Sequence, residues 1–162
     1  MSKFLVAFAT KNGSTEEVAG AIAETLSAAG WSVDLCRASE MRASVATWDL
    51  VVLGAPIYSG RWHRDARRFL KRHRDELGEI PVAVFGMGPR SGDEDAWQRS
   101  RDQLNRALAK GSWLRPVTIA VFGGVDPPRS RGAGRRDLRD WEAIRAWAAE
   151  LPALARATNP GQ

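Results

Sequence analysis

The chain has few of the residues that define several whole classes of protein. Among 162 residues there is one cysteine, Cys36, so no disulfide can form within the chain. A domain of this length buries about 68–70% of its unfolded surface and needs no cross-link to fold. No apolar run approaches the roughly 18 residues of a membrane-spanning helix, and the amino terminus lacks the pattern of a secretory signal. We therefore expect a single domain, residues 1–157, in a cytoplasmic protein, and we predict no metal site.

Acidic residues are outnumbered by basic ones. The 24 Lys and Arg residues exceed the 19 Asp and Glu residues, which gives a net charge of +5. Many of the arginines fall in two clusters, at residues 61–74 and 129–139. A solvated helix face is one interpretation of the first cluster, and a patch for an anionic partner such as a carboxylate-bearing substrate or a membrane surface is the other. The chain carries no recognisable nucleic-acid-binding motif, so we do not expect nucleic acid as a partner.

Apolar strands and helical patterns alternate along the chain. Periodicity predicts strands at 4–9, 31–36, 50–54, 82–85 and 117–122, and helices at 15–29, 63–77, 93–109 and 138–157. Such alternation predicts a parallel sheet with helices on both faces, joined by right-handed crossovers. We therefore expect an α/β three-layer sandwich with a five-stranded parallel sheet in the order 2-1-3-4-5.

Ligands of such sheets bind outside the carboxyl ends of the strands, where the strand order reverses. The loops at 10–15, 55–62 and 86–92 are expected to converge at that point. The first loop leads into a helix, whose unpaired N–H groups and dipole favour a phosphate. A simple helix cap is the alternative interpretation, with Ser14 or Thr15 as the N-cap residue.

The second and third loops are also suited to a ligand. Tyr58 and Trp62 lie in the second loop and could stack on a flat ligand, although aromatic residues in loops also serve packing. The third loop is rich in glycine, which lets backbone amides approach a ligand closely. It follows the fourth strand and its third glycine is one place late, so we reject a dinucleotide-binding fingerprint.

These segments resemble those of the flavodoxin family. The turn Thr10-Lys11-Asn12-Gly13-Ser14-Thr15 is similar to the flavodoxin phosphate loop, T/S-x-T/N-G-x-T, and Gly54–Gly60 is similar to the loop that flanks the flavin. Within the family, the chain most resembles the menaquinone-dependent protoporphyrinogen dehydrogenases of flavodoxin type. The shared segments are Gly-Ala-x-Ile-x-x-Gly followed by His and a basic helix, Trp113-Leu114-Arg115-Pro116 before the fifth strand, and Asp140-Trp141-Glu142 opening the last helix.

The resemblance implies a flavodoxin-like fold, FMN as the cofactor and a set of binding residues. The residues predicted to hold the phosphate are Thr10, Lys11, Asn12, Gly13, Ser14 and Thr15. Those predicted to line the flavin ring are Pro56, Ile57, Tyr58, Ser59 and Gly60 on one side and Gly86, Met87, Gly88 and Pro89 on the other. Those predicted to contact a substrate or partner are Arg61, Trp62, His63, Arg129 and Arg131. No catalytic acid or base is expected, because the flavin carries the electron chemistry; His63 is interpreted as a helix-start residue, with a proton donor as the alternative.

The resemblance implies an FMN-dependent oxidoreductase acting on a small organic substrate such as a porphyrinogen, with a small molecule or quinone as electron partner. Two differences from the family keep alternatives open. The stretch 125–136 is shorter than the apolar-basic insertion of the porphyrinogen enzymes, and the chain is basic whereas electron-shuttling flavodoxins are usually acidic. The alternatives are an electron-transfer protein without its own substrate and a cofactor-free interaction module. Peripheral membrane contact and the oligomeric state are left open.

Overall fold

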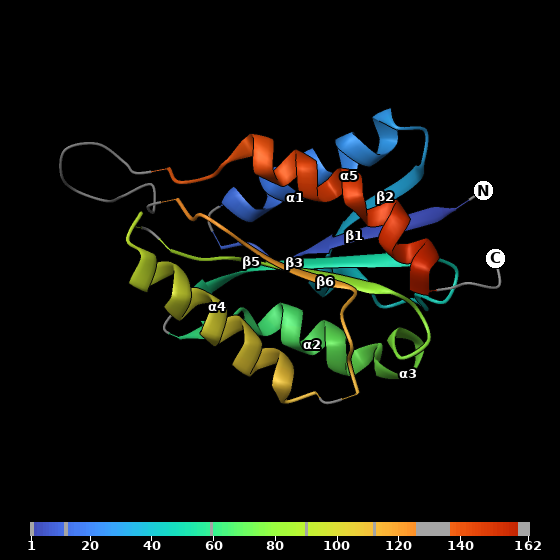
Figure 1. Cartoon of the computed structure of the whole chain (residues 1–162). Helices are drawn as coiled ribbons and strands as arrows, with labels where there is room; N and C mark the ends of the chain where they lie inside the picture. Colours follow the sequence, from blue (N-terminus) through green and yellow to red (C-terminus); the bar gives the residue numbers. More distant parts are fainter. Residues whose placement is uncertain are drawn as a thin grey trace.

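The computed structural model describes residues 2–158, except residues 12, 59, 90, 112 and 126–136. Figure 1 shows a twisted sheet between two layers of helices. Five strands pair in parallel in the order β2-β1-β3-β5-β6, which confirms the predicted strand order. Their bounds are Lys3–Phe8 for β1, Ser32–Arg37 for β2, Leu50–Tyr58 for β3, Val82–Met87 for β5 and Thr118–Phe122 for β6. A short strand that the sequence did not predict, β4 at Arg61–Trp62, pairs antiparallel with β3.

The helices divide between the two faces of the sheet, as predicted (Figure 1). One face carries α1 (Ser14–Ala28) and α5 (Trp141–Thr158), and the other carries α2 (Arg64–Arg72), α3 (Arg74–Leu77) and α4 (Glu94–Ala109). A turn of 3-10 helix at Ala38–Glu40 follows β2. Among the described residues, no helix is both long and apolar enough to cross a bilayer.

The alternation of side chains along β1 explains why the sheet has a core on each face. Phe4, Val6 and Phe8 pack with α1 and α5 in one apolar cluster. Leu5 and Ala7 point to the opposite face and pack with residues of α2, α3 and α4. Every one of these five side chains is at most 4% exposed, as expected for a central parallel strand covered on both sides.

The helix predicted over 63–77 is interrupted at His73, which separates α2 from α3. The His73 ring is buried and its Nε2 lies 2.9 Å from the carbonyl oxygen of Met41, in the segment that leads to β3. The break between α2 and α3 therefore lies at the residue whose buried ring contacts the segment before β3. The helical periodicity of the sequence does not encode this tertiary contact.

The single thiol has the properties of an inert cysteine. Cys36 is half-buried in β2, and burial raises the pKa of its thiol to about 11, with Glu40 and Asp34 acting in the same direction. The thiol is therefore protonated at neutral pH, and the thiolate is the nucleophilic form.

Candidate functional site

The carboxyl ends of β1, β3 and β5 lie side by side at one edge of the sheet. Just beyond β1, the N–H of Ala9 donates to the carbonyl oxygen of Gly54 in β3 at 2.9 Å. At the ends of the next pair of strands, Pro56 is in register with Met87. The positive charge of Lys11 also acts on the ring of His63. The segments that follow these three strands therefore converge, as the strand order predicts.

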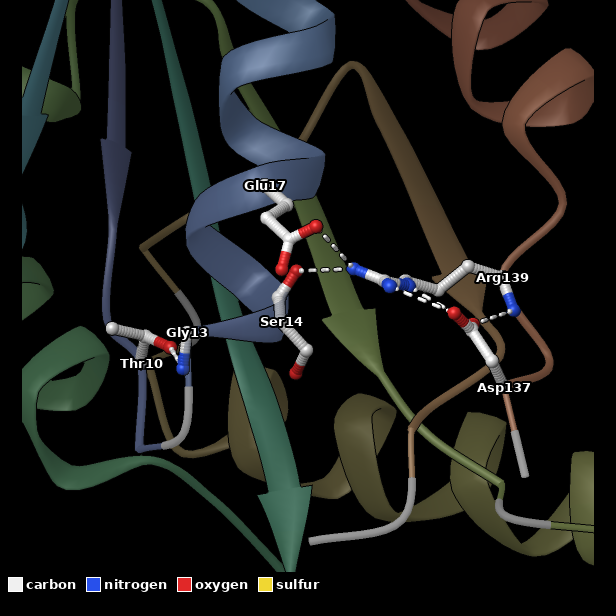
Figure 2. A network of polar contacts seen from close by, with 6 residues as sticks. All are labelled: Thr10, Gly13, Ser14, Glu17, Asp137 and Arg139. Carbon is white, nitrogen blue, oxygen red and sulfur yellow. Dashed lines mark hydrogen bonds and ion pairs between the residues drawn. The ribbon is translucent and has the colours of Figure 1, made fainter. Parts of the chain in front are cut away.

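The turn before α1 presents backbone N–H groups. Gly13 has a φ of +88°, a left-handed conformation that favours glycine. Its N–H donates to Thr10 Oγ1 at 2.9 Å, as Figure 2 shows. The first bond of the helix runs from Glu17 N–H to the Gly13 carbonyl oxygen at 3.2 Å. Gly13 is thus the N-cap residue without a side-chain cap, so the alternative of Ser14 or Thr15 as N-cap is wrong, and the N–H groups of the first helical turn have no acceptor within the helix.

Thr15 adds a buried hydroxyl to this turn. The residue is 1% exposed, and its Oγ1 has no hydrogen-bond partner among the described residues. An unsatisfied buried hydroxyl costs about 1–3 kcal/mol. A group that brings acceptor oxygens to the helix start would satisfy this hydroxyl together with the N–H groups of the first turn, so the residues present fit a phosphate.

Arg139 ties the segment before α5 to the first turn of α1 (Figure 2). Its guanidinium binds Asp137 through two contacts, Nη2 to Oδ2 at 2.7 Å and Nε to Oδ1 at 3.0 Å. Nη1 lies 3.4 Å from Glu17 Oε2 and 3.5 Å from the Ser14 carbonyl oxygen. The hydrogen bonds that Arg139 donates to Asp137, and the negative charges of Asp137 and Glu17, raise the pKa of Arg139. Sequence reasoning did not assign Arg139 to the site, because Ser14 is 125 residues away along the chain.

Replacing Arg139 by Ala is expected to lower the free energy of unfolding by about 1–3 kcal/mol, since hydrogen bonds to charged groups are lost from a side chain that is only 9% exposed. Glu17→Gln is the matched control. The Glu17 side chain is 63% exposed, so its ion pair with Arg139 should contribute at most about 1 kcal/mol. Urea denaturation of both variants measures the two values, and equal losses would contradict this assignment of Arg139.

The second segment is a β-hairpin rather than the predicted loop. β3 continues to Tyr58, and the chain returns through Gly60, whose φ is +73°, into β4. Ala55 and Ile57 extend the strand because both are buried in the core beneath α2 and α4. Proline and glycine in this stretch indicated a loop, but the burial of its alternate residues decides in favour of a strand.

Trp62 belongs to the core. It is 1% exposed, its Nε1–H donates to the carbonyl oxygen of Ala55 at 3.1 Å, and it pairs with Ile57 across the hairpin. The indole is therefore almost fully enclosed by protein, and the predicted contact of Trp62 with a substrate or partner stays a prediction. Its neighbour Arg61 is exposed.

His63 is the N-cap residue of α2, which confirms its interpretation as a helix-start residue. Its Nδ1 accepts a hydrogen bond from the N–H of Asp65 at 3.0 Å, and its own N–H donates to the carbonyl oxygen of Pro56 at 3.0 Å. Burial lowers the pKa of the ring below its ordinary value of 6.5; Asp65 opposes this shift, and the positive charges of Arg64, Arg67 and Lys11 reinforce it. The neutral ring therefore serves as an acceptor at Nδ1.

This cap predicts a pH-dependent contribution to stability. His63→Ala should cost about 1 kcal/mol at neutral pH, whereas His63→Asn, with a side chain that also caps, should cost much less. Because the folded-state pKa of His63 lies below 6.5, its contribution should be complete above pH 6.5 and decline as pH falls further through the lowered pKa. The unfolding free energy of wild type minus that of His63→Asn, followed against pH, isolates this group and should fall on acidification; a rise in this signed difference would contradict the account.

The third segment is also strand where a loop was predicted. Gly86 and Met87 belong to β5, and Met87 is 3% exposed in the core shared with α1 and α5. A Cβ on Gly86 would lie 2.8 Å from Cδ1 of Ile57, and one on Gly88 would lie 2.8 Å from the side chain of Ser100. The Gly88 N–H donates to the Phe122 carbonyl oxygen at 2.8 Å. Gly86 and Gly88 therefore allow the side chains of Ile57 and Ser100 to pack directly against the backbone.

Pro89 is hydrogen-bonded through its backbone to the segment after β6. Its carbonyl oxygen accepts from the N–H of Gly124 at 2.9 Å, and the carbonyl oxygen of Gly124 accepts from the N–H of Leu138 at 3.0 Å. The remaining predicted site residues, Asn12, Ser59, Arg129 and Arg131, and the side chain of Tyr58, lie outside the described part of the structure.

Comparison with known proteins identifies similar sequences and folds. A family model described as a flavodoxin domain matches residues 5–138. The protoporphyrinogen IX dehydrogenase [quinone] of Escherichia coli K12 is 27% identical over 175 aligned residues, which cover 94% of this chain and 96% of the relative. Many solved structures share the fold, two flavodoxins among them. A short-chain flavodoxin associated with a non-canonical PDU bacterial microcompartment has a TM-score of 0.64 and 21% identity, covering 96% of this chain and 99% of the other. Oxidised flavodoxin 2 of Bacillus cereus has a TM-score of 0.59 and 23% identity, covering 94% and 99%.

Proposed function

The chain belongs to the flavodoxin domain family and is an FMN flavoprotein, and from this premise we propose that it is an oxidoreductase that takes electrons from a small organic substrate, such as a porphyrinogen, and delivers them to a quinone. The observation that carries the proposal is the match to a quinone-linked protoporphyrinogen dehydrogenase over nearly the whole of both chains. A single shared segment would support only the cofactor, whereas a match over the whole length of both chains also supports a related reaction.

The first turn of α1 would hold the FMN phosphate. The N–H groups of Ser14 and Thr15 lie at the positive end of the helix dipole, and the Thr15 hydroxyl is buried there without a partner among the described residues. Thr10 Oγ1 accepts from Gly13, so its own proton can be donated to a phosphate oxygen. Asn12 is included from the resemblance of the turn to the flavodoxin phosphate loop.

The β3–β4 hairpin and the end of β5 would lie along the flavin ring. From the described residues, we assign this contact to the backbone at Pro56, Ile57 and Gly60 and at Gly88 and Pro89. We leave Trp62 out, because its indole is enclosed in the core. When bound, FMN supplies the redox chemistry, and the protein contributes binding, orientation and control of access.

An anaerobic assay of protoporphyrinogen IX oxidation, with a menaquinone analogue as acceptor, tests the proposal. We expect turnover that requires both FMN and the quinone. The competing function is that of an electron carrier without its own substrate, which the full-length likeness to flavodoxin structures favours. Reduction of the loaded protein by a flavodoxin reductase, with no porphyrinogen turnover, would overturn the enzymatic proposal in favour of a carrier.

A further inference from the structure

A basic groove runs along the face of the molecule between α2 and α4. It consists of two adjoining hollows of about 260 and 320 Å³ that share Arg67, Ala107 and Lys110. We call it the α2–α4 groove. The six basic residues that line it are Arg61 from β4, Arg67 and Lys71 from α2, Arg74 from α3, Arg106 from α4, and Lys110 just after α4. Among the described residues, no acidic side chain lines either hollow.

These six basic side chains are not neutralised within the part of the chain that the structure describes. All six are exposed, and no carboxylate of the described residues forms an ion pair with any of them. Elsewhere on the surface arginines do find acids, as Arg37 does with Glu16 at 3.0 Å and Arg101 with Glu94 at 2.9 Å. Like charges gathered in one concave surface repel one another and create a positive potential that attracts an anionic partner.

The groove also contains apolar side chains. Leu70, Leu108 and Leu114 line the larger hollow, with Leu108 and Leu114 only 7% and 8% exposed. Trp113 is half-buried beside them, and the guanidinium of Arg74 lies 5.7 Å from the centre of its ring. A ligand that fills the groove therefore meets an apolar floor between two basic rims.

We propose that the α2–α4 groove binds an acidic amphipathic helix of a partner protein. The apolar side of such a helix would cover the half-buried Leu70 and Trp113, and its carboxylates would pair with the basic residues of both rims. The arrangement matches this partner in two separate properties, charge and hydrophobicity, and each can be tested.

The shape of the surface favours a protein segment over a membrane. A flat lipid surface would contact the exposed basic side chains but not the half-buried Leu70 and Trp113 between them, whereas apolar side chains projecting from a helix can reach both residues. Six basic residues at the rims give electrostatic complementarity, which increases the association rate and selects acidic partners. The groove begins at Gly60 and Arg61, in the turn and second strand of the hairpin beside the proposed flavin site, so a partner seated in it would lie next to that site. Binding itself does not depend on FMN.

Calorimetric titration of the full chain with a synthetic peptide tests the proposal. The peptide of about 15 residues carries leucines at helical spacing on one face and glutamates on the other. A scrambled peptide of identical composition tests the need for the apolar face. The double variant Lys71→Glu/Lys110→Glu reverses charge on both rims, and Arg42→Glu/Arg145→Glu makes the same change in net charge at exposed residues outside the groove.

We expect the amphipathic peptide to bind in a salt-sensitive manner and the scrambled peptide to bind much more weakly. The groove variant should bind the amphipathic peptide at least about tenfold more weakly than wild type, and the control variant within about twofold. Equal binding of both peptides, or equal loss in both variants, would overturn the proposal. Groove-dependent binding of vesicles containing about one-third phosphatidylglycerol, without peptide binding, would also overturn it and assign the groove to lipid. Titrations with and without FMN separate this test from that of the cofactor.

Discussion

Thr15→Val is expected to stabilise the protein without cofactor and to weaken its binding of FMN. The Thr15 hydroxyl is buried without a hydrogen-bond partner among the described residues, so its removal should raise the unfolding free energy of the apoprotein by about 1 kcal/mol. The same hydroxyl is proposed to donate to the phosphate. Losing a hydrogen bond to a charged group costs about 1.5–3 kcal/mol, or roughly ten- to a hundredfold in affinity.

Two comparisons make this result specific. Riboflavin lacks the phosphate, so Thr15→Val should change its affinity far less than that of FMN. Thr25→Val is the matched control within the same helix, because its hydroxyl already donates to the Ala21 carbonyl oxygen at 2.8 Å; this variant should bind FMN as wild type does. Fluorescence titration gives the affinities and urea denaturation the stabilities. A Thr15→Val protein that is less stable than wild type and binds FMN equally well would show that the hydroxyl has only a structural role.

Gly54→Ala is expected to destabilise the protein by about 3 kcal/mol or more, because the added methyl group has no space. A Cβ on Gly54 would lie 1.9 Å from the ring of Phe85, its register neighbour on β5. That ring is fully buried and packs against Phe122 and Trp147, with ring centroids 5.8 and 6.0 Å away. The ring cannot move without disturbing this cluster, so the strain should appear directly in the unfolding free energy.

Gly20→Ala provides the opposite case. Gly20 lies within α1, and a Cβ there would meet nothing within 4 Å. Alanine is the better helix former, so this variant should be more stable than wild type by about 0.5–1 kcal/mol. Urea denaturation of both variants measures the contrast; a mild effect at Gly54 similar to that at Gly20 would mean that Phe85 repacks freely.

The fold could be predicted from the sequence because each of its signals is local. Apolar runs such as residues 50–54 are short enough for buried strands, and the apolar positions of α1 recur at helical spacing. The alternation of strands and helices predicts a parallel sheet. The turn before α1, which resembles the flavodoxin phosphate loop, supports the predicted strand order. The limits of elements were harder to predict, since the extension of β3 to Tyr58 depends on burial of Ala55 and Ile57 against distant helices.

The site was predicted less completely, for a related reason. Pro56 and Gly60 in the stretch 55–62 and the glycines in 86–92 indicated open loops, but Gly86 and Gly88 are required by close contacts with Ile57 and Ser100. An aromatic residue in a predicted loop, Trp62, is a core residue because its hairpin folds back onto α4 and β3.

Two features of the structure could not have been predicted from the spacing of residues in the sequence. Arg139 contacts the start of α1 from the far end of the chain. The α2–α4 groove extends the basic cluster at 61–74, for which the sequence left both a solvated face and a patch for an anionic partner open; only the fold brings Lys71 and Lys110 to line the same hollow.

The most direct test of the account is a paired titration of the apoprotein with FMN and riboflavin, followed by quenching of flavin fluorescence. If the turn from Thr10 to Thr15 holds a phosphate, FMN should bind near stoichiometrically and riboflavin at least about tenfold more weakly, the equivalent of one hydrogen bond to a charged group. Absence of FMN binding at concentrations of roughly tens of micromolar, where a Kd of about 1 μM would saturate the protein, or equal affinity for the two flavins, would contradict it.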